Sequence, residues 1–401
     1  RILSSKFRTD FVCVTFIKCY TKVKMECLSR CILYVQLLGL VFIPWTNSTV
    51  IKANTPAMSS SKDSSTSGVS QAPLFLSDNQ VVDLLEWKTL VPAIESVMTG
   101  VVRGQVTQPA RLVMRIPDKD AVVLSMPGYV KGDNTSLGGD HQDDSLAVKI
   151  VTSFTRNKDL GLPSILATVL LYNSDNGKLK VVMEGTEITK WRTAAASVVA
   201  TKHVFPRSAD QGLIVAIMGS GAQAEIHARA FDANFNVKKI NIWNHRYPGA
   251  QALAAKLSSQ GFKSSVKACE HGQDAVNDAD IIVTATYSPV PVVKYEWIVK
   301  RDVHINAVGS GMNHHSELDD GVYSHSSIFF DSEASARNEL KGLYDQFPSN
   351  MIGEVGQLMD CKITASKDYH LTVFHSMGMA SEDVITAKLV YDKYKKQNNK
   401  L

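Results

Sequence analysis

The chain has 401 residues, of which 44% are hydrophobic and 20% charged, a composition typical of globular domains and unlike that of disordered or collagen-like chains. Its formal charge of +4 comes from the first 57 residues, because the remainder holds 35 basic and 37 acidic side chains. The body of the protein therefore gives no electrostatic reason to expect nucleic-acid binding.

Residues 1–70, a leader and a Ser-rich linker, are expected to lie outside the folded part. From Met25, "MECLSRCILYVQLLGLVFIPW" contains an apolar run of about fifteen residues, within signal-peptide range and short for a membrane span. A polar, Ser-rich stretch from Met58 leads directly into the folded pattern, so Met58 is the expected functional start. A signal or anchor at Met25 and a processed extension are the alternatives. No membrane contact is expected for the folded body.

Only two cysteines, Cys269 and Cys361, follow the leader, and they form no CxxC pair. This usage favours a reduced compartment, which we take to be the cytoplasm, and argues against a structural zinc.

The first folded region begins with a helical pattern that Ser77 can cap. Strand-like runs follow, at 110–116, 121–129, 146–154, 165–173 and 178–184, with an Asn-Gly turn before the last of them. This spacing predicts a meander of mostly antiparallel strands. An Ala-rich helix over 189–205 then leads to a second region.

From Gly212 onwards strands and helices alternate. The strands are predicted at 213–218, 240–243, 280–285, 303–308 and 327–331. Such alternation indicates a parallel, doubly wound α/β sheet. The pattern turns helical after Asp331 and ends in an amphipathic helix, "SEDVITAKLVYDKYKKQ", which we expect to return to the first region.

The stretch "LIVAIMGSGAQAEIHARAF", residues 213–231, has the form G-x-G-x-x-A. Gly219 allows the tight turn, and Gly221 lets the backbone approach a pyrophosphate. The helix start at Ala222 and Gln223 would offer free amide groups to the phosphates. Because the motif opens a strand–helix–strand unit of ~30 residues, it predicts a dinucleotide site, an ordinary glycine turn being the alternative.

The end of the second strand indicates which dinucleotide. Sites for NAD usually place a carboxylate there to bind the ribose 2′-hydroxyl. Here the strand ends in Asn244, His245 and Arg246, with no acid, and an arginine would favour a 2′-phosphate. NADPH is therefore expected rather than NADH, unless Arg246 is merely a solvated loop residue.

Five stretches together resemble one family: "GSGAQA", "NIWNH", "EITKWRTAAASVVATK", "HINAVGSG…ELDD" and "TVFHSMGMASEDVITAKLVYD". They are similar to the ornithine cyclodeaminase/mu-crystallin family, over about residues 75–395. The resemblance implies a doubly wound Rossmann domain inserted into an α+β open-barrel domain for substrate binding and dimerisation. The predicted division is 71–200 plus 335–401 for the latter and 201–334 for the NADP-binding Rossmann domain.

The resemblance also implies a substrate site formed by Arg111, Lys149 and Arg192. Chemistry supports these identities, because two guanidiniums can hold a carboxylate and a lysine at the reacting carbon can donate a proton. Each residue also has a plain structural alternative: Lys149 could be an edge-strand charge, Arg111 an outward-facing residue and Arg192 a cation at a helix start. Lys149 is the catalytic candidate. Further cofactor contacts implied by the family are Thr193, Thr284, Thr286, Val308 and Ser376.

The activity that the resemblance implies is NADPH-dependent reduction of cyclic ketimine carboxylates by a homodimer, with iodothyronine (thyroid hormone) binding as a further family property. The rival readings are an ornithine cyclodeaminase, an alanine-type dehydrogenase, and a hormone carrier or crystallin with little catalysis.

One departure weakens the cyclodeaminase reading. That branch carries an aspartate where this chain has Gly311. His314 and His315 follow and could substitute for it, but adjacent side chains point in different directions and no third ligand is evident, so no metal site is expected. The polar stretch 131–144 precedes Lys149 and is expected to shape substrate access.

Overall fold

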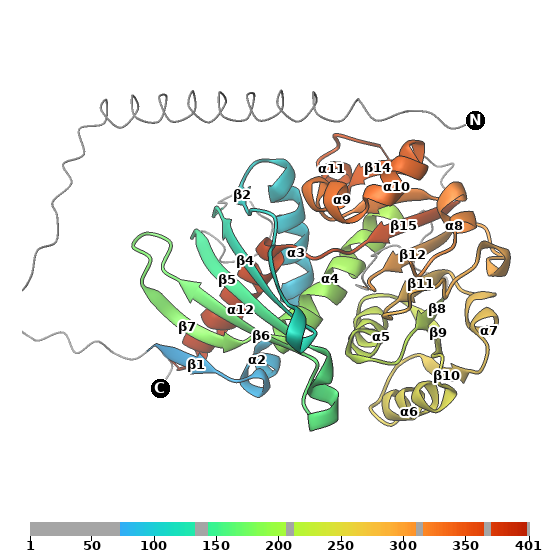
Figure 1. The fold of residues 1–401 in the computed structure, drawn as a ribbon, viewed down its shortest axis with the longest axis horizontal. Helices are drawn as coiled ribbons and strands as arrows, with labels where there is room; N and C mark the ends of the chain where they lie inside the picture. The colour runs from blue at the N-terminus through green and yellow to red at the C-terminus, as the bar shows by residue number, and fades with distance from the viewer. Residues whose placement is uncertain (1–72, 133–142, 206–211, 310–315, 365–369, 399–401) are drawn as a thin grey trace, which may run out of the picture. The chain divides into compact units, whose positions relative to one another are not determined.

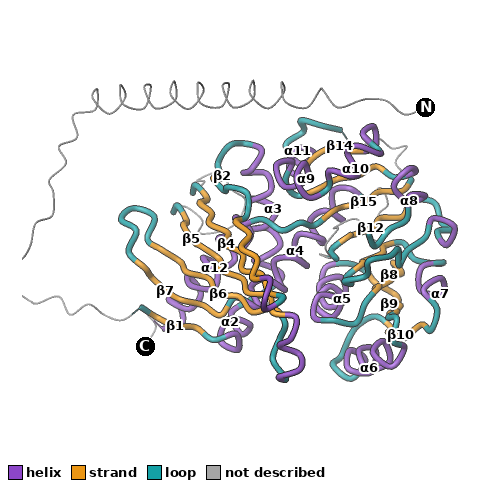
Figure 2. Tube along the Cα trace, in the orientation of Figure 1, coloured by secondary structure: helices purple, strands orange, loops and turns teal. Residues whose placement is uncertain are grey.

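The structure, a computed structural model, describes residues 73–132, 143–205, 212–309, 316–364 and 370–398. These ranges form two sheets, which stand side by side in Figure 1. Figure 2 separates the strands of each sheet from the helices that cover them. Within these ranges no helix combines the length and the apolar character that a membrane crossing needs.

The first sheet has seven strands and is mixed. An antiparallel meander is formed by β4 (Ala121–Val130), β5 (Ser145–Phe154), β6 (Ile165–Tyr172) and β7 (Leu179–Glu184). Strands β2 (Val106–Thr107) and β3 (Leu112–Ile116) pair with β4, and β1 (Leu74–Leu76) runs parallel to β7. Buried and partly exposed residues alternate along most of β5, as expected for a strand with one face on a core. The mostly antiparallel meander is confirmed, while the open-barrel form stays a prediction.

Helices α2 (Asp78–Leu84), α3 (Trp87–Val102), α4 (Thr186–Val204) and α12 (Ala380–Asn398) accompany this sheet. The predicted cap is confirmed, because Ser77 and Gln80 form a reciprocal capping box at the start of α2. In Figure 1 α3 and α4 run between the two sheets.

The C-terminal helix differs from its prediction. It does return to the first sheet, where it packs against β4, β5, α3 and α4. It is not amphipathic along its length, however, because residues 380–388 are all buried. The surrounding elements enclose this half of α12, including Glu382 and Asp383. Solvent reaches mainly the last turns, residues 391–398.

The second sheet is parallel and has the strand order β10-β9-β8-β11-β12-β15-β13-β14. Its strands are β8 (Leu213–Met218), β9 (Val237–Trp243), β10 (Ser265–Cys269), β11 (Ile281–Thr284), β12 (Val303–Ala307), β13 (Ser327–Phe330), β14 (Met351–Glu354) and β15 (Leu371–His375). The helices between them are α5 (Ala222–Asn234), α6 (Tyr247–Ser258), α7 (Gly272–Val276), α8 (Asp320–His325), α9 (Glu333–Glu339), α10 (Lys341–Gln346) and α11 (Val355–Met359). The five predicted strands and the Rossmann-like parallel arrangement are confirmed.

The parallel sheet extends beyond residue 334, the predicted end of the Rossmann domain. Strand β15 lies between β12 and β13, and β14 lies at the sheet edge beside β13. After β15 the chain passes through residues 376–379 into α12, which packs against the first sheet. This turn is therefore the point where the second sheet connects back to the first.

Candidate active site

The glycine loop has the geometry that its motif predicts. Gly219 follows β8 with a φ of +130°, and a Cβ built on it would lie 2.6 Å from the carbonyl oxygen of Ala285, so no larger residue fits. Gly221 is exposed, and a Cβ there would meet nothing within 4 Å. Ala224, by contrast, is fully buried against the sheet. The loop thus leaves open space above Gly221 at the start of the thirteen-residue helix α5.

These features fit a dinucleotide phosphate. Helix α5 begins at Ala222 and has no side-chain cap, so its first amide groups are available to an anion. In the first turn the side-chain oxygen of Gln223 is buried and has no hydrogen-bond partner among the described residues. A bound cofactor could satisfy this oxygen and the free amides together.

The end of β9 carries no carboxylate. His245 and Arg246 are exposed, and Arg246 immediately precedes α6. The side-chain amide of Asn244 donates a hydrogen bond to the carbonyl of Arg246 at 3.1 Å, which orders this corner. A histidine and an arginine therefore lie exposed where an acid would bind a free 2′-hydroxyl.

Thr284 and Thr286, at the end of β11, are held by a residue that sequence reasoning did not assign. The hydroxyls of both threonines donate to the buried carboxylate of Glu317, at 2.7 and 2.6 Å. Val308 follows β12 and is buried. The threonines lie at the expected edge of the sheet, but their hydroxyl protons are engaged within the protein.

Lys149 lies in β5 with its side chain only 1% exposed. Its ammonium is 2.6 Å from Oδ2 of Asp383 on α12, whose side chain is also buried. Burial lowers the pKa of Lys149 to about 8, although the charge of Asp383 opposes this shift. The lysine is thus a buried group that can change its protonation near neutral pH, not a solvated edge-strand charge.

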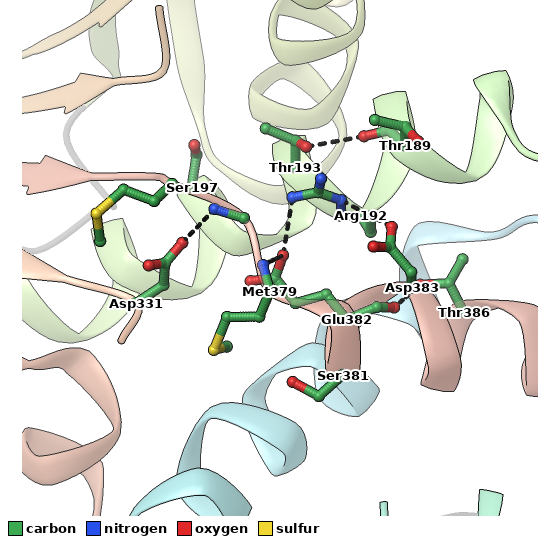
Figure 3. Close-up of polar contacts among 12 residues, drawn as sticks. Thr189, Arg192, Thr193, Ser197, Asp331, Met379, Ser381, Glu382, Asp383 and Thr386 are labelled. Atoms are coloured by element: carbon green, nitrogen blue, oxygen red, sulfur yellow. Dashed lines mark hydrogen bonds and ion pairs between the residues drawn. The ribbon is translucent and has the colours of Figure 1, made fainter. Parts of the chain in front are cut away.

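Arg192, near the start of α4, joins the same cluster. Its Nε donates to Oδ1 of Asp383 at 3.1 Å, and its Nη1 donates to Oε2 of Glu382 at 2.9 Å. Figure 3 shows the guanidinium facing both acids of α12. The neighbouring Thr193 instead bonds back to the carbonyl of Thr189 within its own helix.

Arg111 reaches the cluster from the segment before β3. Its Nη2 donates to the carbonyls of Met377 and Gly378, at 2.6 and 3.1 Å, and lies 3.2 Å from Glu339. Gly378 also touches Arg192, because a Cβ on it would lie 2.3 Å from Nη1. The three predicted cations therefore meet around residues 376–379 and the start of α12.

A buried acid faces this turn from the parallel sheet. Asp331, just after β13, accepts a hydrogen bond from the amide of Gly378 at 2.6 Å. Burial and the nearby charge of Glu382 raise the pKa of Asp331 to about 8. The cations thus lie among several carboxylates, so the net charge of this cluster depends on pH.

The dinucleotide side and the cationic side are joined along one sheet edge. The amide of Ser376 donates to the carbonyl of Ala307 at the end of β12, next to Val308. The hydroxyl of Ser376 is buried without a hydrogen-bond partner among the described residues. From Ser376 two further residues lead to Gly378 and the arginines, so a ligand along this edge would reach both groups.

Sequence reasoning missed four acids of this site: Glu317, Asp331, Glu382 and Asp383. Three of them lie inside stretches already quoted for the family resemblance, "ELDD" and "MASEDV". A usable signal was the adjacent pair of carboxylates in an otherwise apolar helix half, because buried charges need partners. Their pairing with Lys149 and Arg192 could be seen only in the fold.

Gly311, His314 and His315 lie outside the described residues, as does most of the polar stretch 131–144. Among the residues that the structure does describe, no three His, Cys, Asp or Glu side chains are grouped to hold a metal ion.

Comparisons with known proteins identify the family and the fold. The family model described as "Ornithine cyclodeaminase/mu-crystallin family" matches residues 71–398. The mouse protein named ketimine reductase mu-crystallin is 34% identical over 331 residues, which cover 81% of this chain and 98% of that protein.

Two solved structures share the fold. One is Δ1-pyrroline-2-carboxylate reductase from Thermococcus litoralis in complex with NADH and L-proline, with a TM-score of 0.73 and 29% identity. The other is an archaeal alanine dehydrogenase dimer with bound NAD, with a TM-score of 0.72 and 25% identity. Each covers 81% of this chain, and 98% and 97% of the respective known chain.

Proposed function

Because the chain belongs to the ornithine cyclodeaminase/mu-crystallin family, we propose that it is a nicotinamide-dependent oxidoreductase that reduces cyclic imino acids. More narrowly, we propose NADPH-dependent reduction of cyclic ketimine carboxylates, such as piperideine-2-carboxylate or its sulfur-containing analogues. The observation that carries this proposal is the convergence of Arg111, Lys149 and Arg192 on residues 377–383, the turn after β15 and the start of α12, next to the sheet edge that carries the glycine loop.

The two arginines would bind the substrate carboxylate. Both guanidiniums lie next to Gly378, so one turn brings them close together. Arg111 keeps 21% of its side chain exposed and is the more accessible of the two. Arg192 is buried and held by two carboxylates, which orients it before substrate arrives.

Lys149 would supply the proton. The cofactor, when bound, donates hydride to the imine carbon. As the C=N double bond becomes a single bond, the ammonium of Lys149 gives a proton to the nitrogen and Asp383 keeps the lysine in place. The depressed pKa of Lys149, about 8, suits a proton donor near neutral pH.

NADPH is proposed over NADH because β9 ends without an acid and presents Arg246. The solved relatives contain NADH or NAD, so the proposed preference for NADPH rests on this chain's own residues alone. The body's two cysteines, Cys269 and Cys361, are free thiols, which supports a reducing compartment such as the cytoplasm. Hormone binding stays a prediction, which displacement of labelled iodothyronine would test.

We also propose that the protein works as a homodimer. The first sheet exposes large apolar side chains on β3, in the segment between β5 and β6, and on β6, namely Leu112, Val113, Met114, Leu160, Leu162 and Leu166. An apolar group of this kind on a folded protein favours burial against a second copy. Sedimentation of wild type and Met114→Glu tests this, since the charged variant should shift toward monomer.

The activity test uses the purified chain with piperideine-2-carboxylate and either NADPH or NADH, followed by loss of the reduced cofactor's absorbance. We expect turnover with NADPH to exceed turnover with NADH. Ornithine with NAD is the parallel assay, because proline formed without net cofactor turnover would identify a cyclodeaminase instead.

A further inference from the structure

A buried carboxylate that the reaction itself does not use joins the strand ends under the glycine loop. Glu317 is 2% exposed, and both of its oxygens are fully engaged. Oε2 accepts from the hydroxyl of Thr284 at 2.7 Å and from the amide of Gly309 at 2.9 Å. Oε1 accepts from the amide and the hydroxyl of Thr286, at 2.7 and 2.6 Å.

These four bonds tie together segments that are far apart in sequence. Thr284 ends β11, Thr286 lies two residues beyond it, and Gly309 follows β12. The carbonyl of Glu317 also accepts from the amides of Val292 and Val293, at 2.7 and 3.1 Å. Glu317 therefore fixes the ends of β11 and β12 and the loop after β11 relative to one another.

The carboxylate of Glu317 is tightly packed. A Cβ built on Gly309 would lie 2.1 Å from Oε2 of Glu317, so the carboxylate occupies the space that any side chain there would need. On the other side, the carbonyl of Ala285 lies 2.6 Å from the Cβ position of Gly219. The segment that Glu317 holds is thus the surface on which the glycine loop rests.

The position along the sheet indicates which part of the ligand is affected. In the strand order β9-β8-β11-β12, β8 carries the glycine loop and β9 carries Arg246 on one side of it. Glu317 acts on β11 and β12, the opposite side. A dinucleotide lying across the carboxyl ends of these strands would place its adenosine half toward β9 and its nicotinamide half over the segments that Glu317 ties.

We propose that Glu317 is a positioning residue for the nicotinamide half of the cofactor, acting through Thr284, Thr286 and Gly309. This inference rests on the proposed dinucleotide binding. It also changes the expected role of the two threonines, because both hydroxyl protons are donated to Glu317 and not to a cofactor.

The test compares Glu317→Gln with Glu354→Gln in the full chain. Glu354 ends β14, is buried, and accepts a backbone amide at 2.7 Å, so the control makes the same substitution at a similar strand end away from the glycine loop. In glutamine an NH2 group, which donates, replaces one carboxylate oxygen, which accepts. The groups that donate to that oxygen of Glu317 would then lose their acceptor. Affinity is measured by fluorescence titration with NADPH and with 2′,5′-ADP, which lacks the nicotinamide half.

We expect Glu317→Gln to weaken NADPH binding by about tenfold or more while 2′,5′-ADP binds as in wild type, and Glu354→Gln to change neither. Equal NADPH affinity of Glu317→Gln and wild type, or an equal loss for both ligands, would overturn the inference alone. Wild type that binds neither ligand would overturn the proposed cofactor and the inference with it.

A second variant covers the case in which Glu317→Gln does not fold. Thr286→Val removes one hydroxyl donor to Glu317 and keeps the backbone amide. It should weaken NADPH binding several-fold while 2′,5′-ADP binds as in wild type. NADPH affinity equal to wild type in this variant would contradict the proposed role.

Discussion

The ammonium of Lys149 lies 2.6 Å from Oδ2 of Asp383, so that strand β5 and helix α12 are joined by an ion pair whose side chains are 1% and 2% exposed. Asp383 pairs with Arg192 as well. One carboxylate of the C-terminal helix therefore holds both the proposed proton donor and a proposed substrate-binding cation.

This arrangement predicts a large stability loss for Asp383→Asn, because the substitution leaves the buried Lys149 without its counter-charge. Breaking a buried ion pair by removing one partner typically costs about 3–5 kcal/mol. Glu225→Gln is the control, since Glu225 also pairs with two cations, Arg229 and Lys256, at a partly exposed position. Its loss should stay below about 1 kcal/mol. Urea unfolding measures both, and equal losses would contradict the account.

The pKa of Lys149 predicts how the rate depends on pH. The group donates a proton, so kcat should fall as pH rises through about 8, where the ammonium deprotonates. The charge of Asp383 raises this pKa, so in Asp383→Asn the fall should move to lower pH. The measurement is kcat against pH at saturating substrate.

Asp331 provides the control for this profile, because its raised pKa, also about 8, could produce a similar fall. In Asp331→Asn this second titration is absent, and the fall near pH 8 should persist if Lys149 causes it. A profile that becomes flat in Asp331→Asn would assign the titration to the aspartate instead.

Gly378→Ala should impair both folding and catalysis. The residue has a φ of +82°, and its Cβ would lie 2.3 Å from Nη1 of Arg192. Gly177→Ala is the matched control, with a φ of +72° and nothing within 4 Å of the Cβ position. Backbone strain of about 1–3 kcal/mol is expected in both variants, but only Gly378→Ala should raise KM for the ketimine, by about tenfold. Equal KM values in the two variants would show that Arg192 is not displaced.

Arg246→Ala should change cofactor choice. Removing the guanidinium at the end of β9 takes away the group proposed to meet the 2′-phosphate, so KM for NADPH should rise about tenfold while KM for NADH stays unchanged. Lys238→Ala serves as control because Lys238 is exposed at the opposite end of the same strand. A parallel rise in both KM values would argue against recognition of the phosphate.

The architecture could be predicted from sequence where the local patterns are strong. The meander could be predicted from its alternating residues and β8 from its apolar run, and the glycine motif identifies the first strand–helix unit. Strands β1, β2, β10, β14 and β15 were missed because they have two to five residues each and no alternation long enough to count.

The candidate site was predicted less completely. Arg111, Lys149 and Arg192 came from a family resemblance, and the structure brings them together at residues 377–383. Their partners Asp331, Glu382 and Asp383 could not be assigned, because a carboxylate on a helix is usually solvated and its burial depends on what packs around α12. The burial of Glu317 could not be predicted for the same reason, because only the fold brings its donors Thr284, Thr286 and Gly309 together around it.

The most direct test of the account is NADPH oxidation with a cyclic ketimine carboxylate by wild type, Lys149→Ala and Lys180→Ala. Lys180 is a partly buried lysine on β7 of the same sheet, outside the cationic cluster. Loss of a general acid typically lowers the rate by about 10²–10⁴-fold, and we expect such a fall for Lys149→Ala alone, with its NADPH affinity unchanged. Equal rates for Lys149→Ala and wild type would contradict the role of Lys149 as proton donor.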